Sequence, residues 1–248
     1  MKSNKRDTSP TAPFKSALEK ATRALADDPE FKLSVSGSSN ILEGQTAKIP
    51  QISRKMTKGE VLLARGNADA VALKKRFHDS YIHEYYLPKG QLAQRLYHNL
   101  EEARCEIIGA KVLPGTATNL DAKITENIKQ RGQVADVDAE DLSIAEAAGY
   151  VLRQVATGRP LPTSAENLTE KWRDFIQSEA GKTIVNAASA FQEQRSFARF
   201  SRQIIKDLGY AHELGEDPDS LDQENPSSDE VEDLETENNL DDQNENGS

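Results

Sequence analysis

The chain has 248 residues, of which 36% are hydrophobic and 29% charged, a composition that suits one medium-sized domain beside a substantial polar part. No apolar run approaches the roughly 20 residues of a membrane-spanning helix, and the polar segment before Pro13 lacks the apolar core of a secretory signal, so we expect a cytoplasmic protein without membrane contact. The single cysteine, Cys105, excludes an internal disulfide and is expected to be a small packed residue.

The net charge of −10 is divided unevenly along the chain. Residues 213–248 contain 15 acidic and no basic residues, which leaves 26 acidic against 31 basic residues before them. Such a segment cannot bury enough apolar surface to offset its conformational entropy. The sequence therefore predicts a disordered N-terminus over residues 1–12, a folded domain over 13–212 and a disordered acidic linker or tail over 213–248.

In chain order, the first predicted element is a helix over residues 13–26, whose apolar side chains recur at helical spacing until Asp27-Asp28-Pro29 ends it. Alternating apolar and polar residues over 31–36 then predict a half-buried strand. Residues 47–50 are expected to return beside that strand across a glycine- and serine-rich loop. These two segments predict a small β-hairpin.

A long helical hairpin is expected to form the scaffold of the domain. The capping box Thr57-Lys58-Gly59-Glu60 starts a helix that we expect to reach about Tyr86, and a partner helix follows from about Lys89 to Lys111. The linking segment Leu87-Pro88-Lys89-Gly90 favours a sharp turn and hence antiparallel helices. Counting outward from this turn places Asp79 level with His98, and Lys75 and Arg76 near Glu101 and Glu102.

Four further helices complete the predicted domain, at residues 115–128, 142–156, 164–176 and 178–208, with a loop around Arg131-Gly132-Gln133. The predicted fold class is therefore mainly α. It is a multi-helix domain built on a long antiparallel helical hairpin, with a small β-hairpin near the N-terminus and a disordered acidic C-terminal tail.

A succession of short motifs carries a family resemblance. They are Arg65-Gly66-x-Ala68-Asp69-x-x-Ala72-Leu73, His78-Asp79-x-x-x-His83, Glu102-Ala103-Arg104-x-Glu106-x-x-Gly109 and Gly115-x-Ala117-x-Asn119-Leu120, together with Pro13-Phe14-Lys15, Asp28-Pro29-Glu30 and Leu168-x-x-x-Trp172. Their order and spacing resemble the amino-terminal region of the CobT subunit of aerobic cobaltochelatase. The resemblance covers roughly the first 210 residues, nearly all of the chain that is expected to fold.

The resemblance implies a subunit of an ATP-dependent ligase complex that inserts cobalt into hydrogenobyrinic acid a,c-diamide during cobalamin biosynthesis. It implies two partners, an AAA+ cobaltochelatase subunit (CobS-like) that uses ATP-Mg and a very large tetrapyrrole-binding subunit (CobN-like). In the family, a von Willebrand factor A domain with a cation-holding Asp-x-Ser-x-Ser loop follows an acidic linker, and this sequence contains no Asp-x-Ser-x-Ser. The resemblance thus implies an assembly or docking domain that is not catalytic alone, binds no cofactor itself, and serves a complex whose substrate is cobalt.

The polar residues of the hairpin admit two interpretations. Asp79 and His83 are four residues apart, and His98, Glu102 and Glu106 form a second stripe at the same spacing, so their carboxylates and imidazoles are candidate ligands for a divalent metal ion. The Glu-x-x-His pairs of di-iron bundles and the His-Glu-x-x-His zinc signature are absent, and neighbouring basic residues would repel a cation. A structural cluster with an Asp79–His98 hydrogen bond and Arg–Glu pairs around it is therefore preferred.

The remaining motifs predict no chemistry. Ala180-Gly181-Lys182-Thr183 is similar to the end of a phosphate-binding loop, but Ile176 stands where the first glycine belongs. Basic runs at 74–76 and 195–202 are typical of solvated helix faces, and the acidic segment would oppose nucleic-acid binding. We expect no catalytic residue and no nucleic-acid partner. Two alternatives stay open: an independent metal-binding helical protein, and a regulatory protein whose acidic tail masks a basic surface.

Overall fold

The computed structural model describes residues 10–131 and 139–221 of the chain. The described residues up to Gly215 form one compact unit, and those from Glu216 onward, which include the short helix α9 (Pro218–Leu221), belong to a second. Within the described ranges, no helix combines the length and apolar character needed to cross a membrane. The predicted tail lies outside the described residues from position 222 onward, and the predicted domain boundaries stay a prediction.

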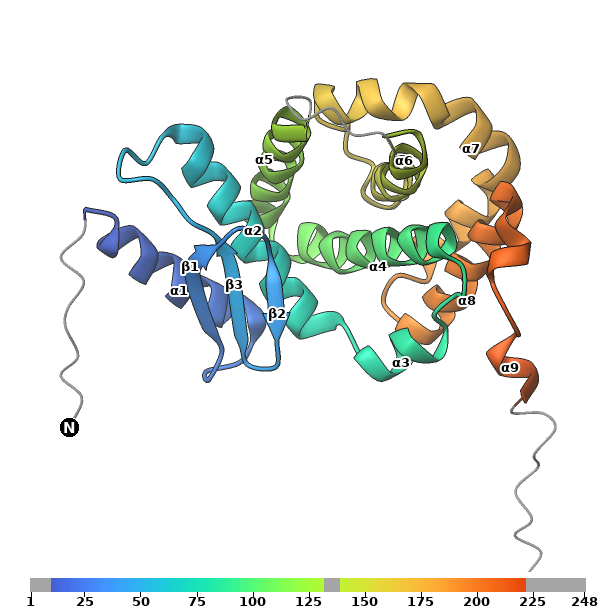
Figure 1. Cartoon of the computed structure of the whole chain (residues 1–248), viewed down its shortest axis with the longest axis horizontal. Coiled ribbons are helices and arrows are strands. Elements are labelled where there is room, and N and C mark those ends of the chain that lie inside the picture. The colour runs from blue at the N-terminus through green and yellow to red at the C-terminus, as the bar shows by residue number, and fades with distance from the viewer. Residues whose placement is uncertain (1–9, 132–138, 222–248) are drawn as a thin grey trace, which may run out of the picture. The chain divides into compact units, whose positions relative to one another are not determined.

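A three-stranded sheet packs against the first two helices of the compact unit (Figure 1). Its strands are β1 (Lys32–Gly37), β2 (Ile41–Glu43) and β3 (Thr46–Pro50), in the order β1-β3-β2. The predicted strands at 31–36 and 47–50 are thus present, but they pair in parallel, so the predicted β-hairpin between them is wrong. The reason lies in the loop, where residues 41–43 form an extra strand and a tight turn at Gly44, with φ of 55°, returns the chain antiparallel beside it.

The core beneath the sheet is apolar. Phe31, Ala47 and Ile49 are fully buried and face helix α1 (Ala12–Ala26) and helix α2 (Lys58–Phe77). Helix α1 closely matches the predicted helix and ends in a left-handed residue at Asp27, with φ of 56°. The expected alternation along β1 is therefore confirmed, because its inward side chains fill this small core.

Helix α2 begins with the predicted capping box. Thr57 Oγ1 accepts from the Glu60 amide at 3.4 Å, and the Glu60 carboxylate accepts from the Thr57 amide at 2.8 Å. Farther along, α2 packs on helix α5 (Pro114–Arg131). The two helices are so close that a Cβ on Gly66 would lie 2.4 Å from the Asn119 carbonyl oxygen. A glycine at position 66 is what permits this approach.

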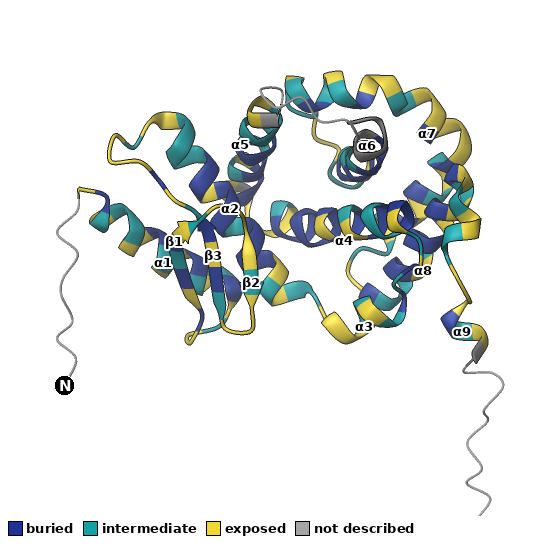
Figure 2. Cartoon of the chain, in the orientation of Figure 1, coloured by how far each residue is buried: buried dark blue, intermediate teal, exposed yellow. Residues whose placement is uncertain are grey.

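The predicted helix from Thr57 to Tyr86 is interrupted, so the expected continuous hairpin is wrong in this detail. Helix α2 ends at Phe77, His78 and Asp79 are extended, and a six-residue helix α3 (Ser80–Tyr85) leads into helix α4 (Gln91–Val112). Helix α4 is the central element, and helix α6 (Ala139–Thr157) packs along it. Figure 2 shows α4 buried along most of its length, in contrast to the exposed outer side of α7.

The C-terminal half closes the core around α4. Helix α7 (Thr163–Ser189) runs through the predicted break near residue 177, because its buried residues continue at helical spacing on both sides. Helix α8 (Gln194–Ile205) follows, and then the π-helical turn η1 (Lys206–Tyr210) and the 3₁₀ turn η2 (Ala211–Glu213). Of the predicted loop at 131–133, Arg131 ends α5 and the other two residues lie outside the described residues. The mainly helical fold class is confirmed.

The turn η2, near the end of the compact unit, is hydrogen-bonded to the start of α4. The Glu213 backbone oxygen accepts from the amides of Lys89 and Gly90 at 3.0 and 2.8 Å, and the Glu213 carboxylate accepts from the Ala93 amide at 2.8 Å. Since Gly90 has no side chain to cap α4, Glu213 does so from more than a hundred residues away. Glu213, the first residue of the predicted tail, therefore makes contacts within the compact unit that ends at Gly215.

Candidate functional site

The junction between α2 and α3 is organised by Asp79. Its carboxylate accepts from the backbone amides of Tyr81 and Ile82 at 2.8 and 3.2 Å, which makes it the N-cap of α3. Its own amide donates to the Gln194 side chain at 2.8 Å. The predicted hydrogen bond between Asp79 and His98 is therefore wrong, since the cap directs this carboxylate along its own helix.

Three imidazoles gather beside this junction, one each from the end of α2, from α3 and from α4. His83 Nε2 and His98 Nδ1 are 2.8 Å apart, a hydrogen bond between two rings. The ring of His83 also lies 4.8 Å from the ring of His78 and 4.6 Å from that of Tyr97, measured between centroids. His83 Nδ1 is buried and, among the described residues, has no hydrogen-bond partner.

The environment of this cluster holds the imidazoles of His83 and His98 uncharged. Burial, followed by the charges of the two neighbouring imidazoles, lowers the pKa of His83 from 6.5 to about 3. Partial burial and the nearby ammonium group of Lys74 lower the pKa of His98 as well. Both rings are therefore neutral near pH 7, the form in which an imidazole nitrogen accepts a hydrogen bond or a metal ion.

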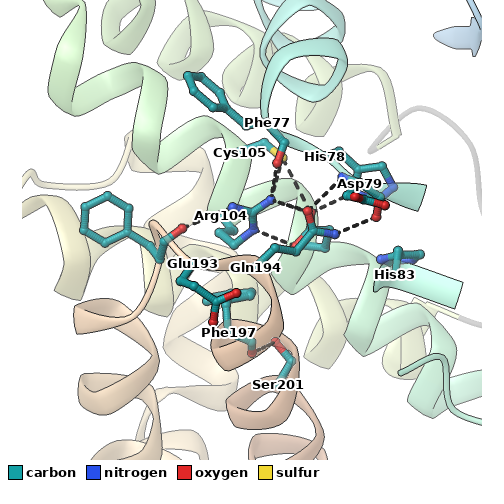
Figure 3. A network of polar contacts seen from close by, with 12 residues as sticks. Phe77, His78, Asp79, His83, Arg104, Cys105, Glu193, Gln194, Phe197 and Ser201 are labelled. Carbon is teal, nitrogen blue, oxygen red and sulfur yellow. Dashed lines mark hydrogen bonds and ion pairs between the residues drawn. The ribbon is translucent and has the colours of Figure 1, made fainter. Parts of the chain in front are cut away.

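Behind the imidazoles lies a buried ionic network centred on Arg104, which is 1% exposed (Figure 3). Arg104 binds both carboxylate oxygens of Glu101 at 2.8 Å. It also donates to the Phe77 carbonyl at 2.5 Å and to the Phe191 carbonyl and Gln194 side chain at 3.1 Å. One guanidinium thus joins the end of α2, the turn between α7 and α8, and the start of α8 to α4.

A further member of this network is His78, whose Nδ1 lies 2.8 Å from Glu101. Burial alone would raise the pKa of the Glu101 carboxyl, but the hydrogen bonds from Arg104 and His78 outweigh it and lower the pKa. The charges of Glu101 likewise raise the pKa of Arg104 against the effect of burial. The network is therefore an ion pair at neutral pH with an imidazole attached to it.

The predicted carboxylates of α4 lie in a different environment. Lys123 of α5 binds Glu102 at 2.9 Å and Glu106 at 2.7 Å, and Arg153 of α6 binds the second oxygen of Glu106 at 2.9 Å. Although burial alone would lower it, the two carboxylates raise the pKa of Lys123. These groups border a cavity of about 160 Å³ between α4, α5 and α6 whose walls are largely polar. Lys123 and Arg153, which face this cavity, are thus already paired with its carboxylates Glu102 and Glu106.

The predicted metal set is consequently divided among three places: the α3 cap with Asp79, the imidazole pair His83–His98, and the lysine-bound carboxylates Glu102 and Glu106. Among the residues that the structure describes, no group of three or more His, Cys, Asp or Glu side chains is placed to hold a metal ion. The five-residue metal site stays a prediction, and only two of its members touch each other through potential ligand atoms.

Other residues singled out from the sequence have structural partners. Lys75 and Arg76 pair with Asp28 and Asp27 at 3.6 and 3.3 Å, so their predicted pairing with Glu101 and Glu102 is wrong. Burial raises the pKa of the Cys105 thiol, so the sulfur stays protonated and packed in the core. Thr183, in the run similar to a phosphate-binding loop, lies within helix α7 and donates to Asp207 at 2.5 Å.

The sequence analysis did not assign to the site its three most connected residues, Glu101, Arg104 and Gln194, although it named the first two in other contexts. A signal was present for the first pair, since a glutamate and an arginine three residues apart form an ion pair on one helix face. Their complete burial and the carbonyl partners of Arg104 come from the packing of distant helices. Gln194 contacts Asp79 across 115 residues of chain and carried no local signal.

Comparison with known proteins identifies one family. The family described as "Cobalamin biosynthesis protein CobT" matches residues 8–248, which is nearly the whole chain. No solved structure matches.

Proposed function

The chain belongs to the CobT family of cobalamin biosynthesis proteins, and from this membership we propose that it acts in an ATP-dependent aerobic cobaltochelatase as an assembly and docking domain. Its proposed partners are an AAA+ subunit (CobS-like) and a large tetrapyrrole-binding subunit (CobN-like). The complex would insert cobalt, its substrate, into hydrogenobyrinic acid a,c-diamide. The observation that carries the proposal is the family match over residues 8–248.

The internal chemistry of the described residues supports a docking role over a catalytic one. Arg104, Lys123 and Arg153 are buried and bound to carboxylates, so they serve the packing of helices. The Cys105 thiol is buried and protonated, which disfavours nucleophilic attack. A body fixed by such contacts is suited to present a constant surface to partner subunits, and ATP-Mg would be bound by the AAA+ partner.

The test is co-purification of this chain with the AAA+ and large subunits from the same cell, followed by a cobalt-insertion assay with and without a separately supplied von Willebrand factor A domain. We expect stable binding to at least one subunit, no insertion by this chain alone, and insertion only by the assembled complex. Failure to bind either subunit would refute docking. Cobalt insertion by the isolated chain would refute the assembly role.

The division of charge favours a second candidate, in which the acidic segment regulates partner binding. Residues 213–248 carry 15 acidic groups beside a body with an excess of basic residues. Removing residues 216–248 leaves the Glu213 cap of α4 intact and so tests the segment alone. Stronger partner binding after this deletion would support masking by the segment, whereas unchanged binding would support a linker.

A further inference from the structure

The contact between His83 and His98 joins two helices of unequal length and burial. His98 sits on the central helix α4 with its side chain exposed, whereas His83 sits on α3, a six-residue helix with no fully buried residue. The 2.8 Å between Nε2 of one ring and Nδ1 of the other means that a lone pair of one nitrogen faces the hydrogen of the other. Two imidazole nitrogens from different helices thus converge on one point.

This arrangement is close to that of two imidazole ligands on one metal ion. Zinc–nitrogen bonds are about 2.0–2.1 Å long, so two nitrogens on a tetrahedral ion stand roughly 3.3 Å apart. To admit an ion in place of the shared hydrogen, the two nitrogens must move apart by about 0.5 Å and the rings must also turn, because a hydrogen bond is close to linear whereas the ligands of the ion meet at the tetrahedral angle. Since α3 is short and half exposed, this movement leaves the buried Arg104 network in place.

We propose that His83 and His98 together bind a divalent transition metal ion of the zinc and cobalt class, with water completing its coordination. The inference goes beyond the docking function and does not depend on it. Imidazole nitrogen is a ligand that suits these ions, whereas magnesium and calcium prefer oxygen. On binding, the shared hydrogen moves to the other nitrogen of the ring that donated it, and both rings stay neutral.

The surroundings of the pair set the strength of the site. His78 lies against His83 and is itself held by the Glu101 carboxylate at 2.8 Å, so a fixed ring borders one side of the His83 imidazole. Against binding stands the positive charge of Lys74, which acts on both rings. Because the protein supplies only two ligands and a lysine lies nearby, we expect the metal ion to bind weakly and to exchange readily with solution.

The experiment uses the full chain without a histidine tag, stripped of metal with a chelator and titrated with Co²⁺. Visible absorption of the bound ion and broadening of histidine ring signals in proton NMR report binding. We expect one equivalent to bind, at least about tenfold weaker binding in His98→Ala, and unchanged binding in His212→Ala. His212 is the matched control, because it is the one histidine outside the cluster. The variant Lys74→Met is expected to bind several-fold more tightly, since it removes a repulsive charge.

Three results would overturn the proposal. They are the absence of binding, binding that His98→Ala leaves unchanged, and binding that is lost in Glu102→Gln or Glu106→Gln while His98→Ala retains it. The last result would return the site to the carboxylates of α4. Because His98 is exposed, His98→Ala is expected to fold, and an unchanged circular dichroism spectrum verifies this.

Discussion

Replacing Arg104 by methionine tests whether its buried guanidinium holds the helix ends together. The variant leaves the Glu101 carboxylate, 5% exposed, with His78 and the weak thiol donor of Cys105 as partners, and it removes the donor to the Phe77 and Phe191 carbonyls. Breaking a buried ion pair from one side costs about 3–5 kcal/mol. We expect a loss of this size in the free energy of unfolding, measured by urea denaturation with far-UV circular dichroism, which corresponds to a midpoint shift of about 1–2 M.

The double variant Arg104→Met/Glu101→Leu separates the pair from the rest of the network. Removing both charges eliminates the unpaired carboxylate, so we expect the double variant to lose about 1–3 kcal/mol less than the sum of the single variants. The matched control is Arg65→Met on α2, where the arginine is exposed and a change within about 0.5 kcal/mol is expected. A loss below about 1 kcal/mol in Arg104→Met, or strict additivity in the double variant, would refute the reasoning.

The same pair fixes the pH range in which it acts. Because the folded state lowers the pKa of Glu101 below its ordinary value of 4.5, the contribution of the pair is complete above pH 4.5 and is lost as the pH falls through the folded-state pKa. The difference in stability between the wild type and Arg104→Met should therefore narrow on acidification below pH 4.5. A difference that stays constant down to low pH would show that the lost stability comes from packing alone.

Three further predictions address separate contacts. Gly66→Ala places a methyl group 2.4 Å from the Asn119 carbonyl oxygen and should cost about 1–3 kcal/mol in urea denaturation, whereas Gly181→Ala, which has open space around it in α7, should be neutral or stabilising. In chelator-containing buffer, lowering the pH from 7 to 5 should reduce the free energy of unfolding by about 1–2 kcal/mol through His83. The reason is that the pKa of this imidazole is 6.5 in the unfolded chain and about 3 in the folded protein, so protons favour the unfolded state. The variant His83→Gln should show a weaker dependence of stability on pH. Glu213→Ala removes the cap of α4 and should cost about 0.5–2 kcal/mol in thermal unfolding, and a smaller loss in Glu213→Gln would identify the acceptor oxygen as the cause.

The sequence predicted best where structure depends on neighbouring residues. The start of α2 follows from the Thr57 capping box, and the end of α1 follows from Asp27-Asp28-Pro29, since both signals act within one helical turn. The apolar alternation of β1 was likewise readable. The direction of strand pairing was not, because it depends on residues 41–43, whose short strand carries no clear pattern of its own.

Long-range contacts decided the remaining differences. Helix α2 ends at Phe77 because the Phe77 carbonyl accepts from Arg104 of α4 and because Asp79 caps a new helix. Aspartate is a residue type that favours N-caps, so this second cause was visible in the sequence, whereas the first was not. Helix α7 passes its expected break because Ile176 and Ala180 continue a buried face. For the candidate site, helical counting brought His98 to the correct region but paired it with Asp79 instead of His83, since the count assumed one unbroken helix.

The hydrogen bonds between Glu213 and the start of α4 also couple amide hydrogen exchange at residues 89–93 to the turn at 211–213. The amides of Lys89 and Gly90 are bonded to the Glu213 backbone oxygen, so solvent reaches these bonds only when the turn at 211–213 detaches. The exchange rate of the Gly90 amide therefore measures how often the turn at 211–213, where the acidic segment begins, detaches from α4. If a partner binds the acidic segment and detaches this turn, deuterium uptake should become faster at the beginning of α4, more than a hundred residues before the segment that the partner binds.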